Sequence, residues 1–217
     1  MNIKVCGITQ MKQLKQLEGL EIDFAGLIFY KDSPRYIGDK LPAQELKTAD
    51  FDLKKVGVFV NPSLSDVLDA IDDYKLDVVQ LHGEESPSLC DDLSTEVEVI
   101  KAFRIAEGVN VDKIVAPYDG VCDFYLFDTK TAYASPLDGS YEGPLGGTGQ
   151  RFDWGLLKNA RIEKPFFLSG GIGIEDAAKI KAFKHPDFFG IDINSRFEKS
   201  PGVKDMGMIL QFRQALK

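Results

Sequence analysis

The sequence contains few of the residues that form disulfides or bind metals. Its three cysteines, Cys6, Cys90 and Cys122, are odd in number, widely spaced and without a CxxC pair, so we expect no disulfide scaffold. His82 and His185 are the only histidines and lie far apart in the sequence, so the sequence offers few ligands for a zinc site. We therefore expect no metal and no cofactor.

The sequence also lacks an excess of positive charge and long apolar runs. It has 26 basic and 34 acidic residues, a net charge of -8, which argues against a nucleic-acid or anionic-membrane partner but not against a small anionic ligand. No stretch approaches the roughly 18 apolar residues of a transmembrane helix. The first residues lack the basic segment, apolar run and cleavage site of a signal peptide. We expect a cytoplasmic protein.

An alternation of strand-like and helix-like segments is present instead. Apolar residues recur at helical spacing after each short β-branched or aromatic run, as at Leu64, Val67, Leu68 and Ile71. Ser63 and the pair Ser86-Pro87 are typical helix starts. The eight predicted strands are Ile3–Cys6, Phe24–Phe29, Lys55–Val60, Val78–Leu81, Val97–Phe103, Phe124–Asp128, Pro165–Ser169 and Phe188–Asp192.

This repetition predicts an α/β fold with a parallel sheet, because each parallel return needs a crossover. Eight units in 217 residues fit a closed (β/α)8 TIM barrel. The alternative is an open doubly wound sheet, which a GxGxxG after the first strand would signal, and Cys6-Gly7-Ile8-Thr9 is not one. No Pro/Gly/Ser-rich linker divides the chain, so we expect residues 1–217 to form a single barrel domain.

A long segment without clear periodicity follows the sixth strand, at about residues 129–151. Loops of this length inside compact domains are usually functional or disordered. In a barrel it would lie on the C-terminal face, where active sites are built. We favour a lid over a ligand rather than a floppy insertion.

Two strand ends carry candidate catalytic residues. Period-two alternation places Cys122, Phe124, Leu126 and Asp128 on one side of the sixth strand, and Lys4 and Cys6 on one side of the first. An acid at the C-terminal end of a barrel strand is typical of catalysis, although a loop-capping aspartate fits Asp128 equally well. A free cysteine such as Cys6 is most often a small buried hydrophobic residue.

Glycine-rich and hydroxyl-bearing turns follow the last two strands. Gly170 and Gly171 come after the seventh strand, and Asn194 and Ser195 after the eighth. Barrels frequently bind a phosphate at these two loops, where backbone N–H groups can approach an anion. Together the turns favour a phosphorylated small molecule as ligand.

Three further polar residues each allow two interpretations. Arg35, after the second strand, is either a solvated charge or a carboxylate-binding fork. His82, after the fourth strand, is a titrating group or, as we favour, a turn donor. Lys4 either reaches water at the floor of the barrel or is a buried ammonium that pairs with an acid such as Asp192 and lowers the Cys6 thiol pKa.

Several segments in fixed order resemble one family, phosphoribosylanthranilate isomerase, essentially from end to end. No single segment is specific, but the ordered set is. The matching segments are Lys4–Thr9, Ser33–Arg35, Val56–Asn61, Gln80–Glu84, Phe127-Asp128, Gly146–Gly149 with Phe152–Trp154, Ser169–Ile172, and Gly202–Asp205.

The resemblance implies a cofactor-free (β/α)8 barrel that carries out an Amadori rearrangement in tryptophan biosynthesis. N-(5-phosphoribosyl)anthranilate would become 1-(2-carboxyphenylamino)-1-deoxyribulose 5-phosphate. Cys6 matches the general base, Asp128 the general acid and Arg35 the residue that holds the anthranilate carboxylate. The implied substrate-binding residues are Arg35, His82, Gly147, Gly170, Gly171, Asp192, Asn194 and Ser195.

One segment departs from the family pattern, and two rival functions stay open. After the last strand the family commonly reads Asp-Val-Ser-Ser-Gly-Val-Glu, whereas Arg196 stands here at the glycine; it would either add a phosphate contact or face solvent. The rivals are a histidine-pathway aminoaldose isomerase, expected to have an aspartate in place of Cys6, and a barrel that only binds a phosphorylated ligand. The chain would be a monomer or a homodimer.

Overall fold

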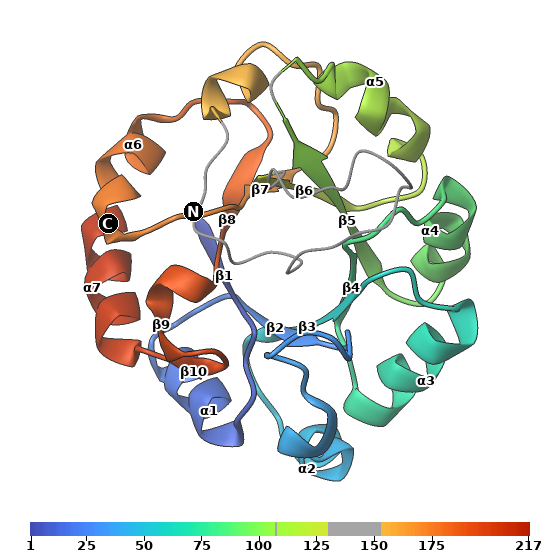
Figure 1. Ribbon diagram of the computed structural model, residues 1–217, viewed down its shortest axis with the longest axis vertical. Helices are drawn as coiled ribbons and strands as arrows, with labels where there is room; N and C mark the ends of the chain where they lie inside the picture. The colour runs from blue at the N-terminus through green and yellow to red at the C-terminus, as the bar shows by residue number, and fades with distance from the viewer. Residues whose placement is uncertain (107, 130–152) are drawn as a thin grey trace.

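Eight parallel strands form a closed barrel in the computed structural model, which describes residues 1–106, 108–129 and 153–217. β1 pairs with both β2 and β8, and this pairing closes the sheet into the ring in Figure 1. The predicted (β/α)8 barrel is therefore confirmed and the open sheet is excluded. The strands are β1 (Asn2–Cys6), β2 (Phe24–Ile28), β3 (Lys54–Phe59), β4 (Val78–Leu81), β5 (Glu98–Ile105), β6 (Phe124–Thr129), β7 (Phe166–Leu168) and β8 (Phe188–Ile193).

Helices surround the barrel and connect its strands (Figure 1). Ser63 begins α3 with a reciprocal capping box to Asp66, and Ser86 begins α4 with Pro87 in its first turn, as predicted. None of the helices in the described ranges is long and apolar enough to cross a membrane. The helices are α1 (Met11–Gly19), α2 (Ala43–Thr48), α3 (Leu64–Tyr74), α4 (Pro87–Ser94), α5 (Val111–Val115), α6 (Ala177–Ala182) and α7 (Met206–Leu216).

Side chains along each strand alternate between the inside and the outside of the barrel, and this alternation produces two separate apolar cores. Side chains such as Val78, Ile100 and Leu126 fill the barrel interior, whereas the larger core lies outside it, under the helices. The prediction that Cys122 shares the inner face of the sixth strand is wrong. β6 begins only at Phe124, so the pleat does not extend back to Cys122, which belongs to the outer core and contacts Cys90 of α4.

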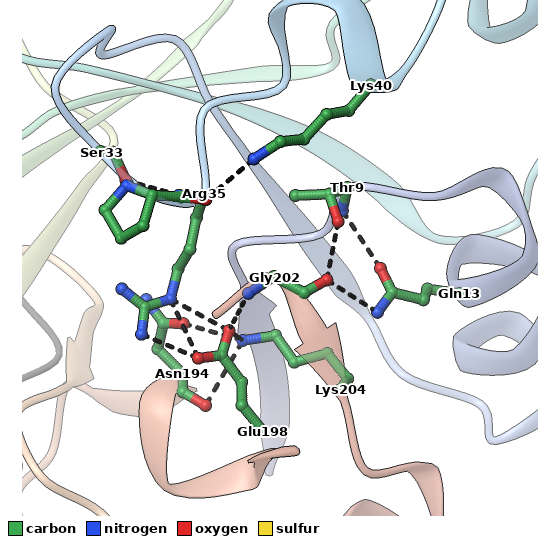
Figure 2. A network of polar contacts seen from close by, with 10 residues as sticks. Thr9, Gln13, Ser33, Arg35, Lys40, Asn194, Glu198, Gly202 and Lys204 are labelled. Carbon is green, nitrogen blue, oxygen red and sulfur yellow. Dashed lines mark hydrogen bonds and ion pairs between the residues drawn. The ribbon is translucent and has the colours of Figure 1, made fainter. Parts of the chain in front are cut away.

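A two-stranded antiparallel hairpin after β8 was not predicted. It comprises β9 (Glu198–Ser200) and β10 (Val203–Lys204). Its turn is fixed to the start of α1, because the Gly202 carbonyl accepts hydrogen bonds from Thr9 Oγ1 at 2.7 Å and Gln13 Nε2 at 3.0 Å (Figure 2). The hairpin thereby brings Glu198 and Lys204 to the end of β1.

Candidate active site

A cavity opens at the carboxyl ends of the barrel strands. Eight of the ten predicted site residues line it: Cys6, His82, Asp128, Gly170, Gly171, Asp192, Asn194 and Ser195. Arg35 lies beside the cavity rather than in its lining. Gly147, with most of the loop predicted at 129–151, lies outside the described residues.

Asp128, near the end of β6, accepts one hydrogen bond and lies against the His82 ring. Its Oδ1 accepts the Thr129 backbone N–H at 2.7 Å, and its Oδ2 lies 3.3 Å from His82 Nε2. Gly170 packs against the carboxylate: a Cβ there would lie 2.8 Å from Oδ1, and the residue has a φ of 89°. Only glycine fits such a contact and conformation without strain. The Asp128 carboxyl is therefore oriented at the edge of the cavity and is only 7% exposed.

Lys4 lies one layer below Cys6 and is completely buried. Its Nζ donates to Asp192 Oδ1 at 2.8 Å, and Ser169 Oγ donates to Asp192 Oδ2 at 3.2 Å. This confirms the predicted ion pair and excludes the interpretation in which Lys4 reaches water. Burial lowers the pKa of Lys4, but Asp192 and Cys6 raise it further, so it lies above its usual value.

The Cys6 thiol is subject to opposing influences. Burial raises its pKa, Lys4 lowers it, Asp192 raises it again, and Lys204 lowers it. The net result is a thiol pKa above the ordinary value. The predicted effect of Lys4 is present in direction, but the effect of burial on the thiol pKa outweighs it.

Arg35 forms a bidentate ion pair with Glu198 of the hairpin (Figure 2). Its Nε lies 3.0 Å from Glu198 Oε1 and its Nη2 2.7 Å from Oε2. The Arg35 chain crosses directly over Gly7, where a Cβ would lie 2.7 Å from Arg35 Cδ. Arg35 is thus placed over Gly7, the residue after Cys6, and its Nε/Nη2 edge is occupied by Glu198.

Lys204 extends this ion pair toward the loop after β8. Its Nζ donates to Glu198 Oε1 and Asn194 Oδ1, each at 2.8 Å (Figure 2). Burial lowers the pKa of Lys204, Glu198 raises it, and the net value is below the ordinary one. For Glu198, burial raises the pKa, but Arg35 and Lys204 together bring it below its usual range. The network links the Arg35 side of the cavity to the Asn194 loop.

The two predicted phosphate loops lie next to each other, because β7 pairs with β8. Gly170 and Gly171 both line the cavity and have positive φ, 89° and 65°. Arg196 also lines the cavity, and its Nη2 lies 2.6 Å from Glu175 Oε1 with the side chain 38% exposed. It is therefore paired with Glu175, an arrangement that neither alternative for Arg196 included.

Sequence reasoning missed Gln80, Glu198 and Lys204. Gln80 and Lys204 fall within the matching family segments, which was the available signal, but a segment match alone does not reveal a contact. Glu198 and Arg35 are separated by 163 positions, and only the folded barrel brings them together. In the part of the chain that the structure describes, no three His, Cys, Asp or Glu side chains are grouped as a metal site.

Comparison with known sequences identifies the family. Residues 3–215 match the family model described as N-(5'-phosphoribosyl)anthranilate (PRA) isomerase. The chain belongs to this family. It is 41% identical to the N-(5'-phosphoribosyl)anthranilate isomerase of Parabacteroides distasonis, an alignment that covers 100% of this chain and 93% of that protein. It is 35% identical to that of Phocaeicola vulgatus, with 100% and 98% covered.

Solved structures agree with this family assignment. The phosphoribosyl anthranilate isomerase of Thermotoga maritima superposes with a TM-score of 0.82 at 30% identity, covering 100% of this chain and 98% of that one. A second family structure contains reduced 1-(o-carboxyphenylamino)-1-deoxyribulose 5-phosphate; its TM-score is 0.77 at 26% identity, with the same coverage. The Thermotoga maritima enzyme is described as dimeric in a further structure.

Proposed function

We propose that this protein isomerises N-(5-phosphoribosyl)anthranilate to 1-(2-carboxyphenylamino)-1-deoxyribulose 5-phosphate in tryptophan biosynthesis, with Cys6 as general base and Asp128 as general acid. One observation carries the assignment of roles: a thiol and a carboxyl from non-adjacent strands, β1 and β6, line one cavity. β7 and β8 separate these strands, so the two groups can approach one bound sugar from different sides.

Asp128 acts first in the proposed mechanism. It donates a proton to the furanose ring oxygen, the C1–O bond breaks, and the nitrogen lone pair forms a C1=N bond, which gives an open-chain protonated imine. His82 Nε2 and the Thr129 N–H both face the carboxylate that remains, and these donors stabilise its developing charge. Their fixed positions orient Asp128 before the substrate arrives.

Cys6 acts second. Its thiolate removes the proton from C2 of the protonated imine to give a neutral enolamine. The enolamine becomes the ketone when C1 gains a proton and the C2 hydroxyl loses one. Only the thiolate is basic. Burial raises the pKa of Cys6, and Lys4 and Lys204 lower it, so both cations favour the thiolate. Neither cation needs to contact the sugar to do so.

The two anionic ends of the substrate fit the two sides of the cavity. Gly170, Gly171, Asn194 and Ser195 would hold the phosphate through backbone and side-chain donors. Arg35 would hold the anthranilate carboxylate with the guanidinium end that Glu198 does not occupy. Gly147, His82 and Asp192 are the other substrate-binding residues of this proposal. Asp192 also holds Lys4 beneath Cys6.

A steady-state assay tests the function directly. Purified protein should remove phosphoribosylanthranilate, followed as a loss of substrate fluorescence, without added metal or cofactor. Turnover only of the histidine-pathway aminoaldose, or binding of phosphorylated sugars without turnover, would instead support one of the two rivals. We propose a cytoplasmic protein without nucleic-acid or membrane partners, and sedimentation would distinguish a monomer from a homodimer.

A further inference from the structure

Gln80 is a polar side chain inside an otherwise apolar part of the barrel. It lies on β4 two residues after Val78, an inner-core residue, and therefore points inward. Its register partners are Val58 on β3 and Ile100 on β5, and both belong to the inner apolar core. Gln80 is only 1% exposed and lines the cavity.

The Gln80 amide nitrogen faces His82. Gln80 Nε2 lies 2.7 Å from His82 Nδ1, and because an amide nitrogen can only donate, Nδ1 accepts this hydrogen bond. The other ring nitrogen, His82 Nε2, lies 3.3 Å from Asp128 Oδ2. The amide oxygen of Gln80 is therefore turned away from the ring.

The Gln80 amide oxygen is left without a donor. Oε1 is buried and has no hydrogen-bond partner among the described residues. The apolar side chains on both neighbouring strands offer it none. A buried carbonyl in this condition is destabilising unless a ligand or water supplies a hydroxyl or N–H group, and Gln80 faces the cavity in which the substrate would lie.

We propose that Gln80 determines specificity by accepting a hydrogen bond from a hydroxyl of the pentosyl part of the substrate. This inference rests on the proposed function. The acid Asp128 must meet the sugar, and His82 joins that acid to Gln80, so the sugar is the part of the substrate that reaches Oε1. The two anionic ends would be held elsewhere, by Arg35 and by the loops after β7 and β8.

Two ligands and two variants test this role. The first ligand is reduced 1-(o-carboxyphenylamino)-1-deoxyribulose 5-phosphate, and the second is 5-(2-carboxyphenylamino)pentyl phosphate, which keeps both anionic ends but has no hydroxyls. Gln80→Met removes the oxygen at similar volume, and Gln80→Glu keeps an oxygen but replaces the amide N–H. Dissociation constants are measured by calorimetry for the wild type and both variants, and circular dichroism checks folding.

Gln80→Met should raise the dissociation constant of the hydroxylated ligand by about tenfold, the typical effect of removing one partner of a buried hydrogen bond. The hydroxyl-free ligand should bind Gln80→Met as tightly as it binds the wild type. Gln80→Glu should retain the preference for the hydroxylated ligand. Equal weakening of both ligands by Gln80→Met, or no weakening of either, would overturn the role of Gln80. If Gln80→Met does not fold, Gln80→Leu replaces it in the same comparison.

Wild-type measurements keep this inference separate from the proposed function. A wild type that neither isomerises phosphoribosylanthranilate nor binds the reduced analogue contradicts the proposed function, and the role of Gln80 with it. A wild type that does both, combined with equal losses in Gln80→Met, contradicts the role of Gln80 alone.

Discussion

The lysine beneath the thiol shows how one buried residue can serve both the fold and the chemistry. Lys4 is completely buried, pairs with Asp192 at 2.8 Å and lowers the pKa of Cys6 by its charge. A buried ammonium without a partner would be too costly to keep. The ion pair therefore keeps a cation next to a thiol that burial alone would hold protonated.

Lys4→Met should raise the thiol pKa of Cys6 further, because it removes a cation and leaves the Asp192 carboxylate, which itself raises that pKa. The pH dependence of alkylation at Cys6, mapped by peptide mass spectrometry to exclude Cys90 and Cys122, should move to higher pH. Combining Lys4→Met with Asp192→Asn removes both charges and should give a smaller shift. An unchanged alkylation profile in folded Lys4→Met would leave Lys4 with a structural role only.

Arg35 is fixed by Glu198 in a geometry that only a guanidinium can provide. The ion pair uses Nε and Nη2 together, and a lysine ammonium cannot contact Glu198 in this way while offering a second donor pair to a substrate. Arg35→Lys should therefore raise KM for phosphoribosylanthranilate by about tenfold and change kcat less.

The control for Arg35 is a ligand that lacks the carboxylate, such as 5-(phenylamino)pentyl phosphate. Its affinity should be the same for wild type and Arg35→Ala, whereas the carboxylate-bearing parent should bind the variant more weakly. If both ligands lost affinity equally, the anthranilate carboxylate would be bound elsewhere.

At the scale of elements, a buried glutamate connects the ends of three strands under His82. Glu85 is 4% exposed and accepts from Lys101 Nζ of β5 at 2.7 Å. It also accepts the backbone N–H groups of Asn61, after β3, at 2.8 Å and of Gly83, after β4, at 2.9 Å. These bonds fix the turn that carries His82 into the cavity.

Burial raises the pKa of Glu85, but Lys101 and the backbone donors lower it more, so it lies below the ordinary value. A lowered carboxyl pKa stabilises the fold above the unfolded pKa, about 4.3, and this contribution is lost as pH falls through the folded value. Glu85→Gln should therefore lower the free energy of unfolding by about 3–5 kcal/mol at pH 7, and by less below about pH 4.

Urea denaturation at pH 7 and below about pH 4 measures the free energy of unfolding of the wild type and of Glu85→Gln. Glu84→Gln is the matched control, because the Glu84 side chain is 87% exposed and lies 3.8 Å from Arg104; exposed pairs contribute little. A loss in Glu85→Gln that was the same at pH 7 and well below pH 4 would show that the ionised form of Glu85 is not responsible.

At the scale of the whole molecule, the barrel was predictable because most of the buried strands are short apolar runs that a helical period follows. Strand parity also predicted Lys4 beneath Cys6. The alternation of side chains gave a wrong prediction for Cys122. It applies only within a strand, and β6 begins two residues after Cys122. The β9–β10 hairpin was missed because strands of two or three residues leave no periodic signal.

The residues gathered at the cavity were found from strand ends and from family resemblance, but their contacts were not. Arg35 was predicted as a carboxylate fork, yet its bond to Glu198 depends on the hairpin, which lies at the far end of the sequence. Gln80 stood in a recognised segment without a role. That its oxygen has no partner among the described residues depends on the apolar strands on either side of it.

The central claim is that Cys6 and Asp128 act as base and acid on one bound sugar. The most direct test compares kcat for phosphoribosylanthranilate in the wild type, Cys6→Ser and Asp128→Asn, with circular dichroism to establish that each variant is folded. Each substitution should lower kcat by at least about a hundredfold, since positioned proton transfer typically contributes roughly 10²–10⁴. Near-normal turnover in either folded variant would contradict the role proposed for that residue.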